Sequence, residues 1–396
     1  MTKSRLHTPE GVRDIYGKEC KNKHYLINVM SNLVKTYGYS FIETPSFEFF
    51  DIFSQEVGTT PSKDLYKFFD REGNTLVLRP DMTPSIARAT SKFFDPDLKP
   101  VRLSYSGNVF INNSSYQGRL KESTQLGCEF MGDNSIDADS EMIALAVKNL
   151  QTVGLKEFQI SIGHVDIFKG LMQAANLDEE AADRVKDLIV NKNFFGVEEL
   201  IAEQGITGDL AKLFKMLGKM YSEPSEWRDF LDIAKGYPQI YDALEYLQDL
   251  YDILNVYDVT KYVSFELGMV SSYQYYTGIL FGGYTYGSGE PILRGGRYDE
   301  LLSYFGKEAP AIGFAIYIDQ LLMALERQKI QIYVEEKQDV VLYSSKNLKS
   351  AVAKTEELRN SGKQATMVRV SSSEDVKKME ELYKDSNIII LSDDID

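Results

Sequence analysis

The sequence predicts an α+β protein with a mixed helix-and-strand core, an inserted helical segment and a small C-terminal α/β domain. Three observations lead to this fold class. The stretch 1–166 mixes helical and strand patterns, and β character returns at 261–330 after an almost wholly helical stretch at 167–260. The stretch 335–396 alternates strands with helices, as a small parallel sheet does. We therefore expect 1–166 and 261–330 to form one core domain that the helices of 167–260 interrupt.

The first helix of this core is predicted from apolar residues at helical spacing. Leu26, Met30 and Val34 recur every four residues, which is typical of an amphipathic helix. Gly38 follows where a helix C-cap is expected. A short strand around 41–42 then has to end before Pro45, because proline cannot donate to a sheet ladder.

Two pairs of strands are predicted further along the core. The stretches 101–111 and 123–131 flank a polar loop at 112–118, and acidic residues at 137, 139 and 141 favour the start of a helix. The aromatic stretch 265–286 leads through the turn 287–289 into 291–294, which indicates a hairpin. In the C-terminal domain, strands are expected at 340–343, 365–370 and 388–391, with helices at 347–361 and 374–383.

The composition favours an intracellular globular protein without a metal or a cofactor. Hydrophobic residues make up 43% and charged residues 26% of the 396 residues, and the net charge is −15. Such a charge repels a polyphosphate such as tRNA unless a basic patch is concentrated locally, and no long window holds one. Two distant cysteines and three histidines argue against a Cys/His metal site. No signal peptide or membrane span is evident, so we expect a cytoplasmic location.

Three short stretches carry polar residues that are ambiguous when each is considered alone. Asp81 is equally well explained as a cap for a helix beginning near Pro84. Gln125 and Glu129 project from one face of a predicted strand, which an exposed sheet face also explains. Paired tyrosines, Tyr275 and Tyr276, are more often packing residues than ligands.

Together these stretches are part of an ordered series of motifs that resembles the histidyl-tRNA synthetases. The resemblance covers about 1–325 and includes the opening TPEGVRDI at 8–15 and the motif 1 stretch TPSFE at 44–48. It continues through the motif 2 strands at 102–110 and 124–129 and the histidine signature at 272–281. It ends with GGRYD at 295–299 and the motif 3 stretch GFAI at 313–316. This resemblance implies a class II synthetase fold, an antiparallel sheet flanked by helices.

The resemblance also implies a histidine-shaped pocket. Asp81, Thr83 and Gln125 match the positions that hold the α-amino group in that family, and Glu129 and Tyr276, with the adjacent Tyr275, match those that read the imidazole. Carboxylates suit an ammonium group, and a Glu–Tyr pair can hydrogen-bond both ring nitrogens.

Departures from the family pattern argue against catalysis. Three positions that carry arginine in active synthetases are occupied here by Ile111, Ser271 and Gln320. Fixed cations stabilise the negative charge that gathers during amino-acid activation, and losing one costs roughly 3–4 kcal/mol of barrier. Arg119 remains in the motif 2 loop as a residue that could bind an anion. The stretch 340–396, with nine basic and ten acidic residues, does not resemble an anticodon-binding surface.

One family combines this fold with these losses, the regulatory subunits of ATP phosphoribosyltransferase. Membership implies no catalytic residue, a homodimer through the core and a hetero-oligomer, expected to be a hetero-octamer, with a short-form catalytic subunit. It also implies histidine as an effector, bound in the pocket or at the subunit interface. Two alternatives stay open: a divergent active histidyl-tRNA synthetase, and a stand-alone histidine-binding or RNA-regulatory paralogue.

Overall fold

The computed structural model describes residues 6–53, 60–96, 99–113, 120–270, 275–332 and 337–391. The chain forms two compact units, Met1–Ile332 and Tyr333–Asp396. The second unit begins within two residues of the predicted C-terminal domain. The further division of the first unit into a core and an inserted helical domain stays a prediction.

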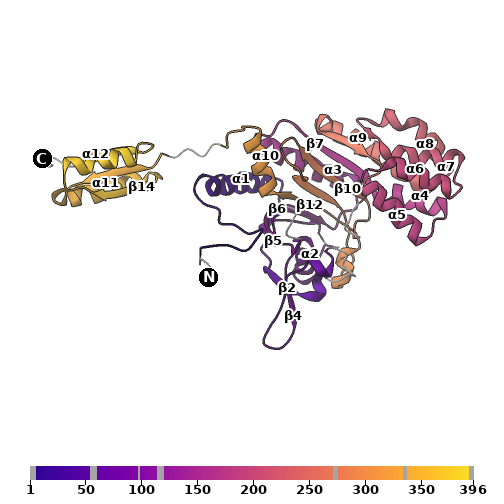
Figure 1. Ribbon diagram of the computed structural model, residues 1–396, viewed down its shortest axis with the longest axis horizontal. Coiled ribbons are helices and arrows are strands. Elements are labelled where there is room, and N and C mark those ends of the chain that lie inside the picture. Colours follow the sequence, from indigo (N-terminus) through magenta and orange to yellow (C-terminus); the bar gives the residue numbers. More distant parts are fainter. Residues whose placement is uncertain are drawn as a thin grey trace, which may run out of the picture. The chain divides into compact units, whose positions relative to one another are not determined.

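A nine-stranded sheet is the centre of the first unit (Figure 1). Its pairs are antiparallel except β1 with β5 and β7 with β9, so the predicted antiparallel sheet is confirmed with two parallel pairs near its ends. In spatial order the strands are β1 (Ser40–Phe41), β5 (Val101–Phe110), β6 (Glu122–Met131), β12 (Ala311–Tyr317), β11 (Leu293–Arg297), β10 (Ile279–Thr285), β7 (Phe158–His164), β9 (Val263–Glu266) and β8 (Met220–Tyr221).

Helices flank this sheet and fill the stretch between β7 and β9. The helices of the first unit are α1 (Gly17–Thr36), α2 (Thr83–Phe93), α3 (Ile136–Thr152), α4 (Val165–Ala175), α5 (Glu179–Val190), α6 (Phe194–Glu203), α7 (Gly208–Lys215), α8 (Arg228–Ala234), α9 (Pro238–Val256) and α10 (Ile318–Arg327). Helices α4 to α8 gather beside β7 and β10 (Figure 1).

The local signals read from the sequence explain how several of these elements begin and end. Gly38 adopts a φ of +83° just after α1, a conformation in which a side chain is strained. The hairpin of β10 and β11 turns through Gly287, whose φ is +89°. Strand β8 was not predicted, because Met220–Tyr221 lies alone within helical sequence. It pairs with β9 at the edge of the sheet.

The two faces of the sheet bury different side chains because successive residues of a strand point to opposite faces. Leu126, Cys128 and Phe130 of β6 pack into the large apolar core that includes buried residues of α1, α3 and α9. A smaller core of α2, β5 and the segment 298–302 contains Met82, Tyr105 and Tyr298. Gln125 and Glu129 alternate with the residues of the large core, so β6 points these two polar side chains away from it.

A second, three-stranded antiparallel sheet carries exposed aromatic residues. It consists of β2 (Phe47–Phe49), β4 (Thr75–Leu78) and β3 (Lys67–Phe69), with β4 in the middle. Phe47 and Phe49 are each 52% exposed and Phe69 is 72% exposed. The motif 1 stretch therefore presents apolar surface rather than contributing only to the core.

The C-terminal unit confirms the predicted alternation of strands and helices. Strands β14 (Ala365–Arg369), β13 (Asp339–Tyr343) and β15 (Asn387–Leu391) form a parallel sheet in that order. Helices α11 (Leu348–Asn360) and α12 (Ser373–Leu382) connect them. Val340 and Leu342 pack toward α12, whereas Val341 packs toward Ala351 of α11.

Candidate functional site

The six residues predicted to recognise a histidine-like ligand line a single cavity. We call it the tyrosine-lined cavity, and its empty volume, including the mouth, is about 340 Å³. The lining residues are Asp81, Thr83, Gln125, Glu129, Tyr275, Tyr276, Arg294, Gly295, Gly296, Tyr298, Gly313, Phe314, Ala315 and Tyr317.

Asp81 and Thr83 reach the cavity from the beginning of α2. The backbone N–H of Met82 donates to Asp81 Oδ1 at 2.7 Å, and Pro84 occupies the first turn, where a missing N–H costs nothing. Asp81 is not the N-cap of this helix, because that position is Met82 and has no side-chain capping hydrogen bond. Asp81 lies in the cavity wall instead. Burial raises the pKa of the Asp81 carboxyl, which indicates that a bound cation would stabilise its charged form.

Gln125 supplies an unsatisfied acceptor to the cavity. Its side chain is 4% exposed, and its Oε1 accepts no hydrogen bond from any residue that the structure describes. A buried acceptor without a partner costs about 1–3 kcal/mol, so a ligand N–H that reached it would recover this cost. Gln125 thus has the character of a binding group and not of an exposed surface residue.

Glu129 is the most deeply buried carboxyl in the wall, at 1% exposure. Thr83 Oγ1 donates to Glu129 Oε1 at 2.8 Å, and the Tyr298 hydroxyl donates to Oε2. Burial raises the pKa of Glu129 to about 8, against an ordinary value of 4.5, in spite of these two donors. A carboxyl that is kept neutral in this way can exchange a proton with a ligand of similar pKa, such as imidazole.

Close packing against a glycine fixes the position of Glu129. The register of β12 and β6 sets Gly313 opposite Glu129. A Cβ atom at position 313 would lie 1.7 Å from Glu129 Oε2, so a side chain there would displace the carboxyl. Glu129 can therefore occupy this position in the cavity wall only if residue 313 is a glycine.

Tyr275 and Tyr276 form one wall, and their rings lie 4.8 Å apart. Tyr276 packs so closely on β11 that a Cβ atom at Gly296 would lie 2.6 Å from its ring. The Tyr275 ring also meets the Tyr298 ring edge-on, with centroids 5.9 Å apart. The two tyrosines thus pack against neighbouring side chains and also line the cavity. The packing role and the lining role that the sequence left open do not exclude each other.

Sequence reasoning missed several lining residues, including Tyr298, Arg294 and Tyr317. The motif GGRYD at 295–299 was recognised, but its tyrosine was not assigned to the pocket. The signal was there, since Tyr298 follows two glycines that leave room for neighbouring side chains. Arg294 is exposed and lines the mouth.

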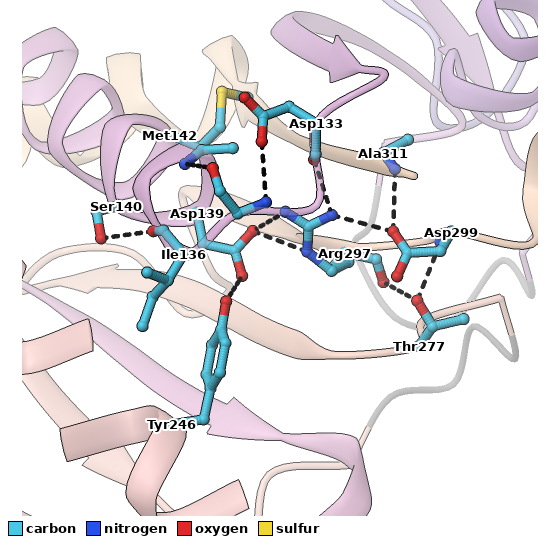
Figure 2. A network of polar contacts seen from close by, with 12 residues as sticks. Asp133, Ile136, Asp139, Ser140, Met142, Tyr246, Thr277, Arg297, Asp299 and Ala311 are labelled. Carbon is cyan, nitrogen blue, oxygen red and sulfur yellow. Dashed lines mark hydrogen bonds and ion pairs between the residues drawn. The ribbon is translucent and has the colours of Figure 1, made fainter. Parts of the chain in front are cut away.

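Arg297, in the same motif, is an ion-pair residue. Its guanidinium is buried, with Nε 2.9 Å from Asp139 Oδ1 and Nη1 3.1 Å from Asp299 Oδ1 (Figure 2). Asp139 had been predicted only as an acidic residue near the start of α3. It is completely buried, because it is the partner of this arginine.

A second cavity lies where β5 and β6 meet α1 and α10. Asn108, Thr124, Lys23 and Asp319 line it, together with Arg13, Asp14, Ile15, Leu120 and Glu122. We call it the paired-charge cavity. Lys23 Nζ lies 3.1 Å from Asp319 Oδ1, and Arg13 pairs with Glu19. The described lining residues include three carboxylates and two cations. Both cations, Arg13 and Lys23, already pair with a carboxylate.

Of the three arginine positions that are substituted here, two lie among the described residues. Ile111 follows β5, and its backbone N–H donates to the carbonyl of Lys121. Gln320 lies in α10 and accepts from Ser288 Oγ at 3.3 Å. Ser271 and the candidate anion ligand Arg119 lie outside the described residues.

The part of the chain that the structure describes contains neither a candidate metal centre nor a candidate membrane span. No group of three or more His, Cys, Asp or Glu side chains there could hold a metal ion. None of the described helices is long and apolar enough to cross a bilayer.

The fold, the motif order and the cavity define a histidyl-tRNA synthetase-like protein. The histidyl-tRNA synthetase family model matches residues 11–321. A histidyl-tRNA synthetase structure from Nostoc shares the fold, with a TM-score of 0.81 at 19% identity over 98% of this chain and 92% of that one.

More similar proteins identify the branch of this class. A regulatory subunit of ATP phosphoribosyltransferase from Acetivibrio thermocellus is 41% identical over 91% of this chain and 86% of its own length. One from Ruminiclostridium cellulolyticum is 38% identical over 99% and 94%. The crystal structure of an ATP phosphoribosyltransferase regulatory subunit/histidyl-tRNA synthetase from Bacillus halodurans C matches with a TM-score of 0.86, at 32% identity over 98% and 99%. The chain belongs to the family of ATP phosphoribosyltransferase regulatory subunits.

Proposed function

We propose that this chain is a non-catalytic regulatory subunit that binds histidine in the tyrosine-lined cavity and controls a short-form ATP phosphoribosyltransferase. The reaction is the first step of histidine biosynthesis, in which ATP is joined to phosphoribosyl pyrophosphate. The observation that carries the proposal is that the six residues line one cavity, in which the buried Gln125 Oε1 accepts no hydrogen bond from any residue that the structure describes.

Recognition of the α-amino group is assigned to Asp81, Thr83 and Gln125. An ammonium group has three donors, and Asp81 and Gln125 offer a carboxylate and an unpaired amide oxygen from two different elements. A bound ammonium would offset the burial cost of the Asp81 charge. This pairing is stronger than a neutral hydrogen bond.

Recognition of the imidazole is assigned to Glu129 and Tyr276, with Tyr275 and Tyr298 holding them. The pKa of Glu129, about 8, lies close enough to that of imidazole for the two groups to share one proton. A neutral carboxyl donates to the bare ring nitrogen, and a carboxylate accepts from a protonated one. Either form keeps the pair hydrogen-bonded, which suits a side chain that titrates near neutrality.

Catalytic silence is inferred from the missing cations. Activation of an amino acid with ATP gathers negative charge that fixed cations have to stabilise. Ile111, Ser271 and Gln320 occupy three positions where that charge would be met by arginine in the resembled enzymes.

The partners follow from the family and from the surface. Relatives named regulatory subunits imply a catalytic subunit, and we infer a hetero-octamer in the cytoplasm with histidine as effector. A homodimer through the core would cover apolar surface such as Phe47, Phe49 and Phe69. We infer no tRNA binding, because the net charge is −15 and the C-terminal stretch is not basic.

Reconstitution with the cognate short-form transferase tests this function. The two proteins should co-elute, and the mixture should synthesise phosphoribosyl-ATP faster than the transferase alone and be inhibited by histidine. Linkage requires that transferase and histidine alter each other's affinity equally. If the proteins neither co-elute nor change each other's activity or histidine response, the assignment is wrong. Histidine binding without any effect of the transferase would favour the stand-alone paralogue.

A further inference from the structure

A buried polar network connects the tyrosine-lined cavity with the helices that follow β7. Its centre is the Arg297–Asp139 ion pair between β11 and α3, both partners of which are less than a tenth exposed (Figure 2). Arg297 Nη1 also contacts the carbonyl of Asp133 at 3.2 Å. Isolated buried charges are costly, so this pair fixes the local geometry of the strand and the helix that carry it.

The network reaches the cavity in two ways: through Thr277, which hydrogen-bonds the backbone of Arg297, and through Tyr298, which follows Arg297 in the chain. The carbonyl of Arg297 accepts from the backbone N–H of Thr277 at 2.8 Å, and Thr277 directly follows Tyr276. Asp299 N donates to Thr277 Oγ1 at 3.0 Å. Tyr298, the residue after Arg297, donates a hydrogen bond from its hydroxyl to Glu129. A ligand that fixed Tyr276 and Glu129 would therefore restrain Thr277 and Tyr298, the two residues through which Arg297 is connected to the cavity.

The network reaches the helices through one hydroxyl group. Tyr246 of α9 donates to Asp139 Oδ2 at 2.6 Å, the oxygen that Arg297 does not use (Figure 2). The Tyr246 ring meets the ring of His164 edge-on, with centroids 5.6 Å apart. His164 in turn accepts from Asp166 N as the N-cap of α4. Tyr246, in the middle of α9, thus contacts both Asp139 of the buried network and His164 at the start of α4.

We propose that Tyr246 is a positioning residue through which α9 and the occupancy of the tyrosine-lined cavity influence each other. This inference rests on the proposed binding of histidine in that cavity and adds the route by which binding reaches the helical stretch 165–256. Tyr246 touches no ligand itself. It acts by holding Asp139, which holds Arg297, which sets the position of the Tyr276 and Tyr298 segments.

Coupling of this kind is reciprocal, so it predicts effects in both directions. Loss of the Tyr246 hydroxyl leaves Asp139 Oδ2 without a partner among the described residues and loosens the pair that holds β11. Residues along such networks change the affinity of a distant ligand by about twofold to thirtyfold. We expect Tyr246→Phe to weaken histidine binding by about threefold to tenfold, within that range.

Tyr241 provides a matched control on the same helix. Its hydroxyl also donates to a carboxylate, Glu245 Oε1, at 2.5 Å, but that pair is at the surface and has no connection to Asp139. The experiment titrates full-length wild type, Tyr246→Phe and Tyr241→Phe with L-histidine by calorimetry. Hydrogen exchange of the α9 amides is measured in each protein with and without histidine.

Histidine is expected to slow amide exchange in α9 of the wild type and of Tyr241→Phe, and to slow it much less in Tyr246→Phe. Of the two variants, only Tyr246→Phe is expected to bind histidine more weakly than the wild type. If Tyr246→Phe binds as tightly as the wild type, or if its exchange rises equally with and without histidine, Tyr246 has only a structural role and the inference is overturned. If the wild type binds no histidine, the proposed function fails and this inference fails with it. Histidine binding with no response in α9 overturns the inference alone.

Discussion

Two cavities of this chain differ in whether their polar side chains are already paired. In the tyrosine-lined cavity Gln125 Oε1 accepts no hydrogen bond from any described residue, and burial raises the pKa of Glu129 to about 8. In the paired-charge cavity Lys23 and Arg13 are already bound to carboxylates. Unsatisfied buried groups raise the free energy of the folded protein unless a ligand pairs them. This difference supports the proposal that the tyrosine-lined cavity binds a ligand, because its unpaired acceptor would gain a partner.

The largest expected effect concerns activation itself. With arginine absent at positions 111, 271 and 320, each loss costs about 3–4 kcal/mol of barrier, so histidyl-adenylate should not form at a measurable rate. The measurement is histidine-dependent exchange of labelled pyrophosphate into ATP, with an active histidyl-tRNA synthetase as the positive control. Exchange well above background would remove the contrast between the two cavities and favour a divergent synthetase.

The second prediction tests whether Glu129 is kept at a cost to stability. Between pH 4.5 and about 8 the folded protein holds a proton on Glu129 that the unfolded chain has released, so this group's contribution to the free energy of unfolding falls as the pH rises. Glu129→Gln removes this dependence. At pH 9 the variant should therefore exceed the wild type in free energy of unfolding by about 5 kcal/mol, and at pH 4.5 by much less.

Urea unfolding from pH 4.5 to 9 measures this difference. Glu141→Gln is a suitable control, because Glu141 is a half-buried carboxylate that pairs with Arg102 and its replacement should lower the stability. Stability curves of wild type and Glu129→Gln that run parallel across the pH range would show that Glu129 is ordinary, and that the wall of the cavity stores no such cost.

The smallest expected effect is on ligand affinity when the other cavity is changed. Lys23→Met breaks the pair with Asp319 and should lower the free energy of unfolding by about 1–3 kcal/mol, since a buried carboxylate loses its cation. Histidine affinity measured by calorimetry should stay within about twofold, because Lys23 lines only the paired-charge cavity. A loss of affinity comparable with that of a cavity-wall variant would mean that the two cavities act as one site.

Most of the fold could be predicted because its signals are local. Helix periodicity, Gly38, the turn at Gly287 and the alternation in the C-terminal unit each depend on a few neighbouring residues. Strand β8 could not be predicted, because two residues carry no period and their pairing with β9 depends on distant sequence. The exposed phenylalanines of the small sheet also have no local signature, since a strand pattern does not tell which face meets solvent.

The site was predictable only in part, for a similar reason. The six predicted wall residues came from matching positions to a family, and the cavity brings them together. What the sequence did not reveal are partnerships across the sheet, such as Tyr298 with Glu129, Arg297 with Asp139, and Gly313 opposite Glu129. Each joins residues more than 150 positions apart, so the tertiary fold and not a local pattern creates them.

The central claim, that histidine recognised by the tyrosine-lined cavity regulates the partner, is tested most directly by one inhibition curve. Phosphoribosyl-ATP synthesis by the reconstituted complex is measured against histidine concentration, with wild type and with Glu129→Ala. Removing Glu129 leaves a ring nitrogen of the bound ligand unpaired at a cost of about 1–3 kcal/mol, so the variant's curve should shift to histidine concentrations about five to a hundred times higher. An unshifted curve, from a complex of the same composition and basal activity, would contradict the account and point to histidine bound elsewhere, at the subunit interface.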